Sequence, residues 1–299
     1  MNILQKPFIN YLKVLDACRG AISEPGIALR FVLARNQLSK AFNEYDREAT
    51  AHRLFSLPAS GRAHPEQVVV KNLTKGELVD LYSIHMIGDS KPARAYYDQI
   101  KLIAPLRKCP FCGFGQVTTL DHFLSKARYP TFSILPSNLI PSCSDCNKGK
   151  GSSIVTQAKQ LLHPYFESKC IETKPWLFVE VIETVPPTVL YFVVPPTSYP
   201  HDLAFRVRNH FSDFELERRF SIEATTELST LADLLADLND YDLINDHLKR
   251  VARVERKHRK NSWKAALYDA LSHNSWYKNG GFRREVKERQ ATSHLNFLY

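Results

Sequence analysis

Two Cys-x-x-Cys pairs constrain this chain more than any other feature of its sequence. Cys109 and Cys112 form the first pair, and Cys143 and Cys146 form the second. Each pair places two thiolates on a tight turn, and two such turns supply the four tetrahedral ligands of a structural zinc ion. A redox dithiol needs one pair only, and a cytosolic chain keeps its disulfides reduced. The four cysteines therefore predict a structural zinc site.

The polar residues between and after the two pairs form a recognisable pattern. Residues 118–122 read Thr-Thr-Leu-Asp-His, Asn138 follows Pro-Ser, and the second pair runs directly into Asn147 and, three residues later, Lys150. This order resembles the HNH (ββα-metal) endonuclease family, in which an Asp-His dipeptide ends the first strand and a central Asn precedes a second Cys-x-x-Cys that runs into Asn-x-x-Lys. The resemblance covers about residues 105–165 and implies a metal-dependent nuclease with a ββα core.

The chemistry of phosphodiester hydrolysis suits these residues, since it needs an activated water and charge neutralisation on the phosphate. His122 is the candidate general base, because a neutral imidazole takes a proton from water near pH 7. The resemblance implies that Asp121 and Asn147 are ligands of a catalytic metal and that Asn138 orients the His122 loop or ring. Oxygen ligands favour Mg²⁺ or Mn²⁺ at this second site. Neighbouring residues of a regular strand point to opposite faces, so the Asp-His pair must lie at a strand end to act together.

Several further residues are candidates for contacts around this site. His163 is a candidate third metal ligand or substrate contact, although a single histidine is more often structural. Lys126, Lys148 and Lys150 are candidates for gripping the phosphate. The sequence departs from the family pattern at Ser125, where related sequences often have Pro, and an Asn as the last motif residue leaves a third protein ligand open.

The charge of the chain is strongly uneven along its length. The formal net charge is +9, but residues 101–160 carry 8 basic and 2 acidic residues, residues 161–240 carry 6 and 13, and residues 241–299 carry 13 and 6. Such basic segments suit a polyanionic partner, although a solvated charged surface is the alternative explanation. The predicted phosphate contacts of the C-terminal segment are Arg253, Arg256, Lys257 and Lys260.

The leading functional hypothesis is therefore a metal-dependent DNA endonuclease with a His-activated water. Cleavage of RNA, such as tRNA, by the same metal site is one alternative, because a metal-activated water attacks both backbones. A zinc module that binds nucleic acid or a partner protein without catalysis is the other.

Sequence periodicity predicts an α+β fold with helical flanks around the compact core. Apolar spacing predicts helices over residues 7–20 and 25–47, and Thr74 with Glu77 indicates a capping box. Pro92, a good first-turn residue shortly after Ser90, predicts a helix over 93–103. β-Branched and aromatic runs on either side of Pro186-Pro187 predict a hairpin within residues 176–194, and a leucine stripe after residue 200 predicts a further helix. The expected regions are 1–104 (helical), 105–168 (nuclease core with the four-cysteine zinc site) and 169–299 (hairpin, then helices with a basic end).

Neither a membrane span nor a secretion signal is expected. The most apolar run is far shorter than the roughly 18 residues of a spanning helix, and residues 1–18 lack a continuous apolar region, so a cytoplasmic location is predicted. The layout resembles bacterial HNH effectors that act with an ATPase or another sensor protein in defence against phage. The acidic segment 161–240 would then be the partner-facing surface.

Overall fold

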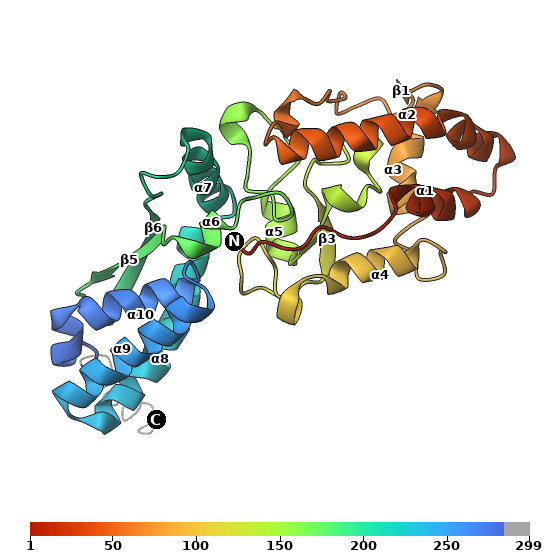
Figure 1. The fold of residues 1–299 in the computed structure, drawn as a ribbon. Helices are drawn as coiled ribbons and strands as arrows, with labels where there is room; N and C mark the ends of the chain where they lie inside the picture. The colour runs from red at the N-terminus through yellow and green to blue at the C-terminus, as the bar shows by residue number, and fades with distance from the viewer. Residues whose placement is uncertain (284–299) are drawn as a thin grey trace. The chain divides into compact units, whose positions relative to one another are not determined.

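The structure is a computed structural model, and it describes residues 1–283. The chain divides into two compact units, with the boundary between Ser168 and Lys169. Residues 1–104 and 105–168, which the sequence analysis separated, belong to the first unit together. Figure 1 shows the first unit in red to light green and the second in darker green to blue. Helices and small antiparallel sheets make up both units, so the predicted α+β class is confirmed.

The first unit begins with two helices. Residues 1–10 have no regular structure, and α1 (Tyr11–Gly20) begins four residues later than predicted because the side chain of Asn10 caps it by accepting from the Leu12 N–H. The long α2 (Pro25–Thr50) begins at a proline, which suits the first helical turn. Its buried face includes Phe31, Leu38 and Phe42 at helical spacing, as predicted.

Two shorter helices flank the core of the first unit. A short ribbon of β1 (Val68–Val70) and β2 (Leu73–Thr74) leads into α3 (Lys75–Ser83), and both hydrogen bonds of the predicted Thr74/Glu77 capping box are present. The next helix, α4 (Arg94–Leu102), packs against both strands of the core. The predicted helix over 93–103 is confirmed within one residue at each end. Single-turn segments η1 (Leu54–Ser56) and η2 (Pro105–Arg107) complete this part.

The core itself is a two-stranded sheet followed by a helix. Strand β3 (Thr119–His122) pairs antiparallel with β4 (Leu139–Ser142), so that Asp121 faces Ile140 and His122 faces Leu139. The connection holds the turns η3 (Pro130–Phe132) and η4 (Pro136–Asn138), and α5 (Ser144–Gly149) begins directly after β4. The turn η5 (Gln157–Lys159) lies in the segment that follows. The order β3-β4-α5 is a ββα arrangement (Figure 1).

In the second unit, a β-hairpin packs against helices. After α6 (Cys170–Thr173), β5 (Leu177–Ile182) and β6 (Thr188–Val193) pair antiparallel, which confirms the predicted hairpin. The helices are α7 (His201–Asp213), α8 (Leu216–Leu238), α9 (Tyr241–His258) and α10 (Trp263–His273), followed by the π-turn η6 (Tyr277–Gly281). Helices α8 and α10 pack on the hairpin, and Leu228, Leu231 and Leu235 of the predicted stripe are buried. Within residues 1–283, no helix is long and apolar enough to cross a membrane.

Candidate functional site

The four cysteines of the two pairs come together in the first unit. The Sγ atoms of Cys109, Cys112, Cys143 and Cys146 lie within 4.8 Å of one another, and all four residues are buried. The Sγ atoms of Cys112 and Cys143 are 3.9 Å apart. Four thiolates at about 2.3 Å around a tetrahedral zinc ion have their sulfur atoms just under 4 Å apart. This cluster could therefore hold a zinc ion, as the spacing predicts.

The first pair is shaped by backbone bonds and by two glycines. The Gly113 N–H donates to the Cys109 carbonyl at 2.8 Å, and the Cys109 N–H donates to the Gly115 carbonyl at 2.8 Å. Gly113 has a positive φ of 82°, which a residue with a side chain rarely adopts. A Cβ on Gly115 would lie 2.9 Å from Sγ of Cys143 and 3.3 Å from Sγ of Cys112. Gly115 thus lies directly against the four-cysteine cluster, although the sequence analysis did not name it.

The thiols of the cluster strongly influence one another. Burial raises the pKa of the Cys109 thiol, whereas hydrogen bonds from neighbouring thiols, that of Cys109 first, lower the pKa of Cys143. Four buried thiolates this close together would repel one another, so the cluster does not hold all four in the thiolate form by itself. A bound cation removes that conflict, because thiolates are the form that zinc binds.

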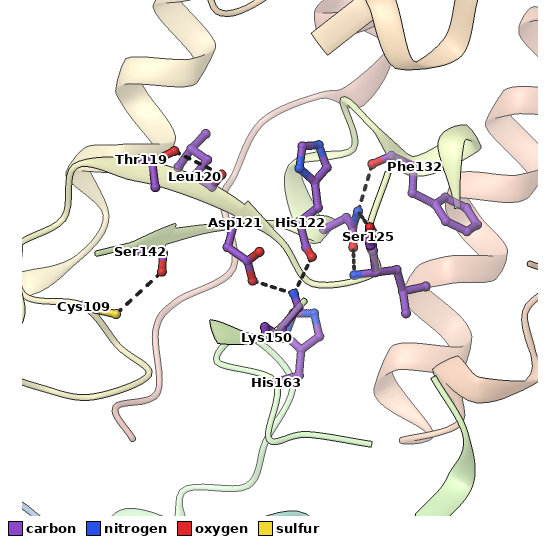
Figure 2. A network of polar contacts seen from close by, with 12 residues as sticks. Cys109, Thr119, Leu120, Asp121, His122, Ser125, Phe132, Ser142, Lys150 and His163 are labelled. Atoms are coloured by element: carbon purple, nitrogen blue, oxygen red, sulfur yellow. Dashed lines mark hydrogen bonds and ion pairs between the residues drawn. The ribbon is translucent and has the colours of Figure 1, made fainter. Parts of the chain in front are cut away.

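Asp121 forms a buried ion pair with Lys150. The Nζ atom of Lys150 lies 2.5 Å from Oδ2 of Asp121 and also donates to the backbone carbonyl of His122 (Figure 2). The side chains of Lys150 and Asp121 are only 9% and 6% exposed. Burial raises the pKa of the Asp121 carboxyl, and the adjacent Lys150 ammonium opposes that shift. Two oxygen atoms thus converge on one cationic atom at the end of β3.

His122 is the last residue of β3, but the strand end does not bring the two side chains together as the sequence analysis expected: the His122 ring points away from Asp121 (Figure 2), and only the His122 backbone carbonyl lies beside the Asp121 carboxylate. Its Nε2 lies 2.8 Å from the backbone carbonyl of Ser133, and its ring makes an edge contact with Tyr82 at a centroid distance of 4.4 Å. Because a carbonyl only accepts, Nε2 carries the hydrogen and Nδ1 carries the lone pair. Burial lowers the pKa of His122 to about 3, with a smaller effect from Lys126, so the imidazole is neutral at neutral pH.

Asn138 holds the loop that carries the Ser133 carbonyl. It is fully buried, and its Oδ1 accepts from the Leu124 N–H at 2.7 Å and from the Tyr45 hydroxyl at 2.9 Å. Its Nδ2 donates to the carbonyls of Leu124 and Phe132, each at 3.0 Å. Asn138 therefore ties Leu124 and Phe132 of the loop after His122 to one buried amide, and none of these four bonds goes to the imidazole ring. Of the two roles that the sequence analysis left open, the loop contact is the one present.

His163 lies in a packed aromatic cluster. Its Nδ1 accepts from the Tyr165 N–H at 3.2 Å, and its Nε2 is 3.2 Å from the Tyr45 hydroxyl. Its ring centroid is 4.0 Å from that of Phe123. Both ring nitrogens are thus engaged within the protein, and this geometry is that of a structural histidine. In residues 1–283, the four-cysteine cluster is the one group of three or more His, Cys, Asp or Glu side chains arranged to hold a metal ion.

The remaining motif residues lie at different depths around the core. Asn147 is a half-buried residue of α5, and Lys150 follows it by three positions as the C-cap of that helix. Lys148 is exposed. Lys126 donates to the Ser83 hydroxyl at 2.7 Å and lies over the ring of Tyr82, so part of its side chain is held by α3.

The basic residues of the C-terminal segment belong to the second unit. Arg253, Lys257 and Lys260 are exposed, as phosphate contacts must be. Arg256 instead forms an ion pair with Asp269 of α10 at 2.8 Å and donates to the Lys260 carbonyl. The segment is not one helix, because α9 ends at His258 and α10 begins at Trp263.

Comparison with known proteins gives one similar chain. The protein is 27% identical over 301 residues to protein ea31 of Escherichia phage lambda, and the match covers 94% of this chain and 100% of that protein. No protein-family model and no solved structure matches the chain.

Proposed function

We propose that the protein is a metal-dependent HNH endonuclease that hydrolyses the phosphodiester bonds of DNA. The observation that carries the proposal is the hydrogen bond from Nε2 of His122 to the Ser133 carbonyl. It leaves the lone pair on Nδ1 of an imidazole that burial keeps neutral, which is the protonation state of a general base. The Asp-His dipeptide at the end of β3, the ββα order and the adjacent four-cysteine cluster support the same assignment.

The oxygen atoms at the end of β3 fit a hard divalent cation. Oδ2 of Asp121 and the carbonyl of His122 already converge on one positive atom, Nζ of Lys150. Carboxylate and carbonyl oxygens are the ligands that Mg²⁺ and Mn²⁺ prefer, and the amide of Asn147 on α5 is the third candidate ligand. A divalent ion bound by Asp121, the His122 carbonyl and Asn147 would supply positive charge for the developing negative charge on the phosphate and the leaving oxygen.

In this reaction the base, its supporting residue and the basic side chains would each have a separate role. Nδ1 of His122 takes the proton from the attacking water, and Asn138 keeps the ring in place by fixing the loop that holds Ser133. A bound phosphodiester places negative charge near the imidazole, which raises the pKa of His122 toward the neutral range where a base works best. Lys126 and Lys148 contact the phosphate backbone, and Arg253, Lys257 and Lys260 of the second unit add salt-dependent affinity.

The test compares wild type with His122→Ala. Both proteins are first shown to contain one zinc ion per chain and to melt at the same temperature. They are then incubated with supercoiled plasmid and with total RNA, each with Mg²⁺ or Mn²⁺. We expect wild type to nick the plasmid and His122→Ala to lose at least about 10²-fold of the rate, the range of general base catalysis.

The other outcomes identify the alternatives. Degradation of RNA with intact plasmid would replace DNA by RNA as the substrate. Salt-sensitive binding of nucleic acid by both proteins, with no cleavage by either, would contradict the enzyme assignment and favour a zinc module that only binds. Equal cleavage by both proteins would refute His122 as the base.

The expected defence role and ATPase or sensor partner gain no support from the comparisons, since the similar protein is itself a phage protein. The proposal is therefore limited to the nuclease reaction and its nucleic-acid substrate.

A further inference from the structure

Lys150 makes contacts that are unusual for a lysine at the end of a short helix. Its ammonium is buried against the Asp121 carboxylate and the His122 carbonyl (Figure 2). It also lies 5.3 Å from the centroid of the Phe123 ring. A lysine at such a site loses the hydration of its charge, and only the paired carboxylate and carbonyl compensate for that loss. The Lys150 ammonium is therefore held by the two oxygen atoms at the end of β3, those of Asp121 and of the His122 backbone.

These are the oxygen atoms to which the proposed function assigns the divalent cation. The Lys150 ammonium, 2.5 Å from Oδ2 and also bonded to the His122 carbonyl, takes the position that a divalent ion bound to these same two oxygen atoms would take. Two positive charges at such a separation also repel strongly where water is excluded. Lys150 and a divalent ion therefore exclude each other.

We propose that Lys150 is an internal cation that holds the catalytic metal site closed until a divalent ion displaces it. The ammonium compensates the buried charge of Asp121 and keeps the site ordered without metal. On displacement it becomes available to the phosphate of the substrate. This inference rests on the proposed function and adds to it the order of events, in which metal entry and release of Lys150 are one step.

The surroundings of Lys150 allow this movement. The residue stands at the end of a six-residue helix, between Gly149 and Gly151. Gly151 has a φ of +66°, and a Cβ there would meet no atom within 4 Å. Most of the segment 151–159 is exposed. Lys150 is therefore followed by an exposed segment, which leaves space for its ammonium to turn outward while the helix start at Cys143 stays at the cysteine cluster.

The first experiment measures how accessible the Lys150 amine is. The full-length zinc-loaded protein is treated briefly with an amine-acetylating reagent, with and without Mg²⁺, and acetylation at each lysine is measured by mass spectrometry. If the contact is present in about nine of ten molecules, full displacement raises the labelling rate of Lys150 about tenfold. The exposed Lys159 serves as the internal reference. Asp121→Asn should label rapidly at Lys150 even without Mg²⁺.

The second experiment measures metal affinity directly, with Mn²⁺ as the probe and electron paramagnetic resonance as the readout. If the ammonium occupies the site in about nine of ten molecules, Lys150→Met should bind Mn²⁺ about tenfold more tightly than wild type, because no ammonium competes for the site. Lys159→Met removes the same charge nearby and should bind as wild type does. Asp121→Asn should lose the site.

The results separate this inference from the proposed function. Protection of Lys150 at saturating Mg²⁺, or unchanged or weaker Mn²⁺ binding by Lys150→Met, would overturn the inference. If wild type nevertheless nicks plasmid and His122→Ala does not, the nuclease assignment stands. Equal Mn²⁺ binding by wild type and Asp121→Asn would overturn both the inference and the assigned metal site.

Discussion

Replacing Asn138 by alanine should strongly destabilise the first unit. Its amide group accepts two hydrogen bonds and donates two, and all four lie in the buried interior between β3, α2 and the loop 123–137. Alanine leaves the Leu124 N–H, the Tyr45 hydroxyl and the carbonyls of Leu124 and Phe132 without these partners. A buried polar group that loses its partner costs about 1–3 kcal/mol. Because part of the loop can relax, we expect a loss of about 3–5 kcal/mol in the free energy of unfolding.

Two further variants serve as controls for the size and the location of this loss in stability. Tyr45→Phe removes the hydroxyl bond to Asn138 and the contact with His163 but keeps the other three bonds of the amide, so it should cost about 1–2 kcal/mol. Asn261 is the corresponding residue of the second unit, where Oδ1 accepts from the backbone N–H groups of Trp176 and Leu177. Asn261→Ala should destabilise the second unit instead.

The assay must distinguish the two units. Tryptophan emission does not, because all three tryptophans of the chain follow residue 168. Hydrogen exchange followed by mass spectrometry reports on each unit through its own peptides. A loss of about 3 kcal/mol corresponds to exchange about a hundredfold faster for the slowest amides of β3 and β4 in Asn138→Ala. A change below about fivefold in those amides would refute the reasoning, since it would mean that the loop does not depend on this amide.

Three further perturbations have direct readouts. Cys143→Ser should lose the zinc ion and unfold the first unit, measured by elemental analysis and circular dichroism, whereas Cys170→Ser in the second unit should keep both. Gly115→Ala should weaken zinc binding at least about tenfold in a chelator competition because its Cβ crowds two thiolates, and Gly20→Ala, which meets no atom within 4 Å, should not. The pKa of His122 is about 3 when folded and near 6.5 when unfolded, so the unfolded state binds the extra proton between these values. Stability of the first unit should therefore fall as pH falls from about 6.5 toward 3, with a smaller slope in His122→Asn in acid titrations followed by circular dichroism.

Features set by neighbouring residues were predictable from the sequence. The capping box at Thr74, the hairpin within 176–194 and the four-cysteine cluster each depend on residue types at fixed short spacings, and all three are present. The start of the first helix was wrong by four residues, because apolar spacing continues through residues 7–10 while the cap at Asn10 sets the boundary. Local patterns therefore identify elements better than they locate their ends.

The partners of the site residues were not predictable in the same way. The Ser133 carbonyl, the Tyr45 hydroxyl and the Tyr82 ring all contact site residues from 11 to 93 positions away in the sequence. A backbone carbonyl has no residue type to recognise, and Tyr45 looks like any other apolar position of an amphipathic helix. Lys150 carries a stronger signal, since it belongs to the Asn-x-x-Lys motif, but its ion pair with Asp121 depends on how α5 lies on β3.

The candidate catalytic residues lie on the loop that the cysteine cluster closes. Cys109 and Cys112 precede β3, and Cys143 immediately precedes α5. The thiols of Cys112 and Cys143 meet across 31 positions of sequence. That loop contains Asp121, His122 and Asn138. A zinc ion bound by the four cysteines would close this loop, reduce its conformational freedom in the unfolded state and hold α5 against the end of β3. The Lys150–Asp121 contact should therefore depend on zinc: a chelator that removes the ion should expose Lys150 to acetylation even without Mg²⁺, whereas retained protection would mean that packing alone holds α5 in place.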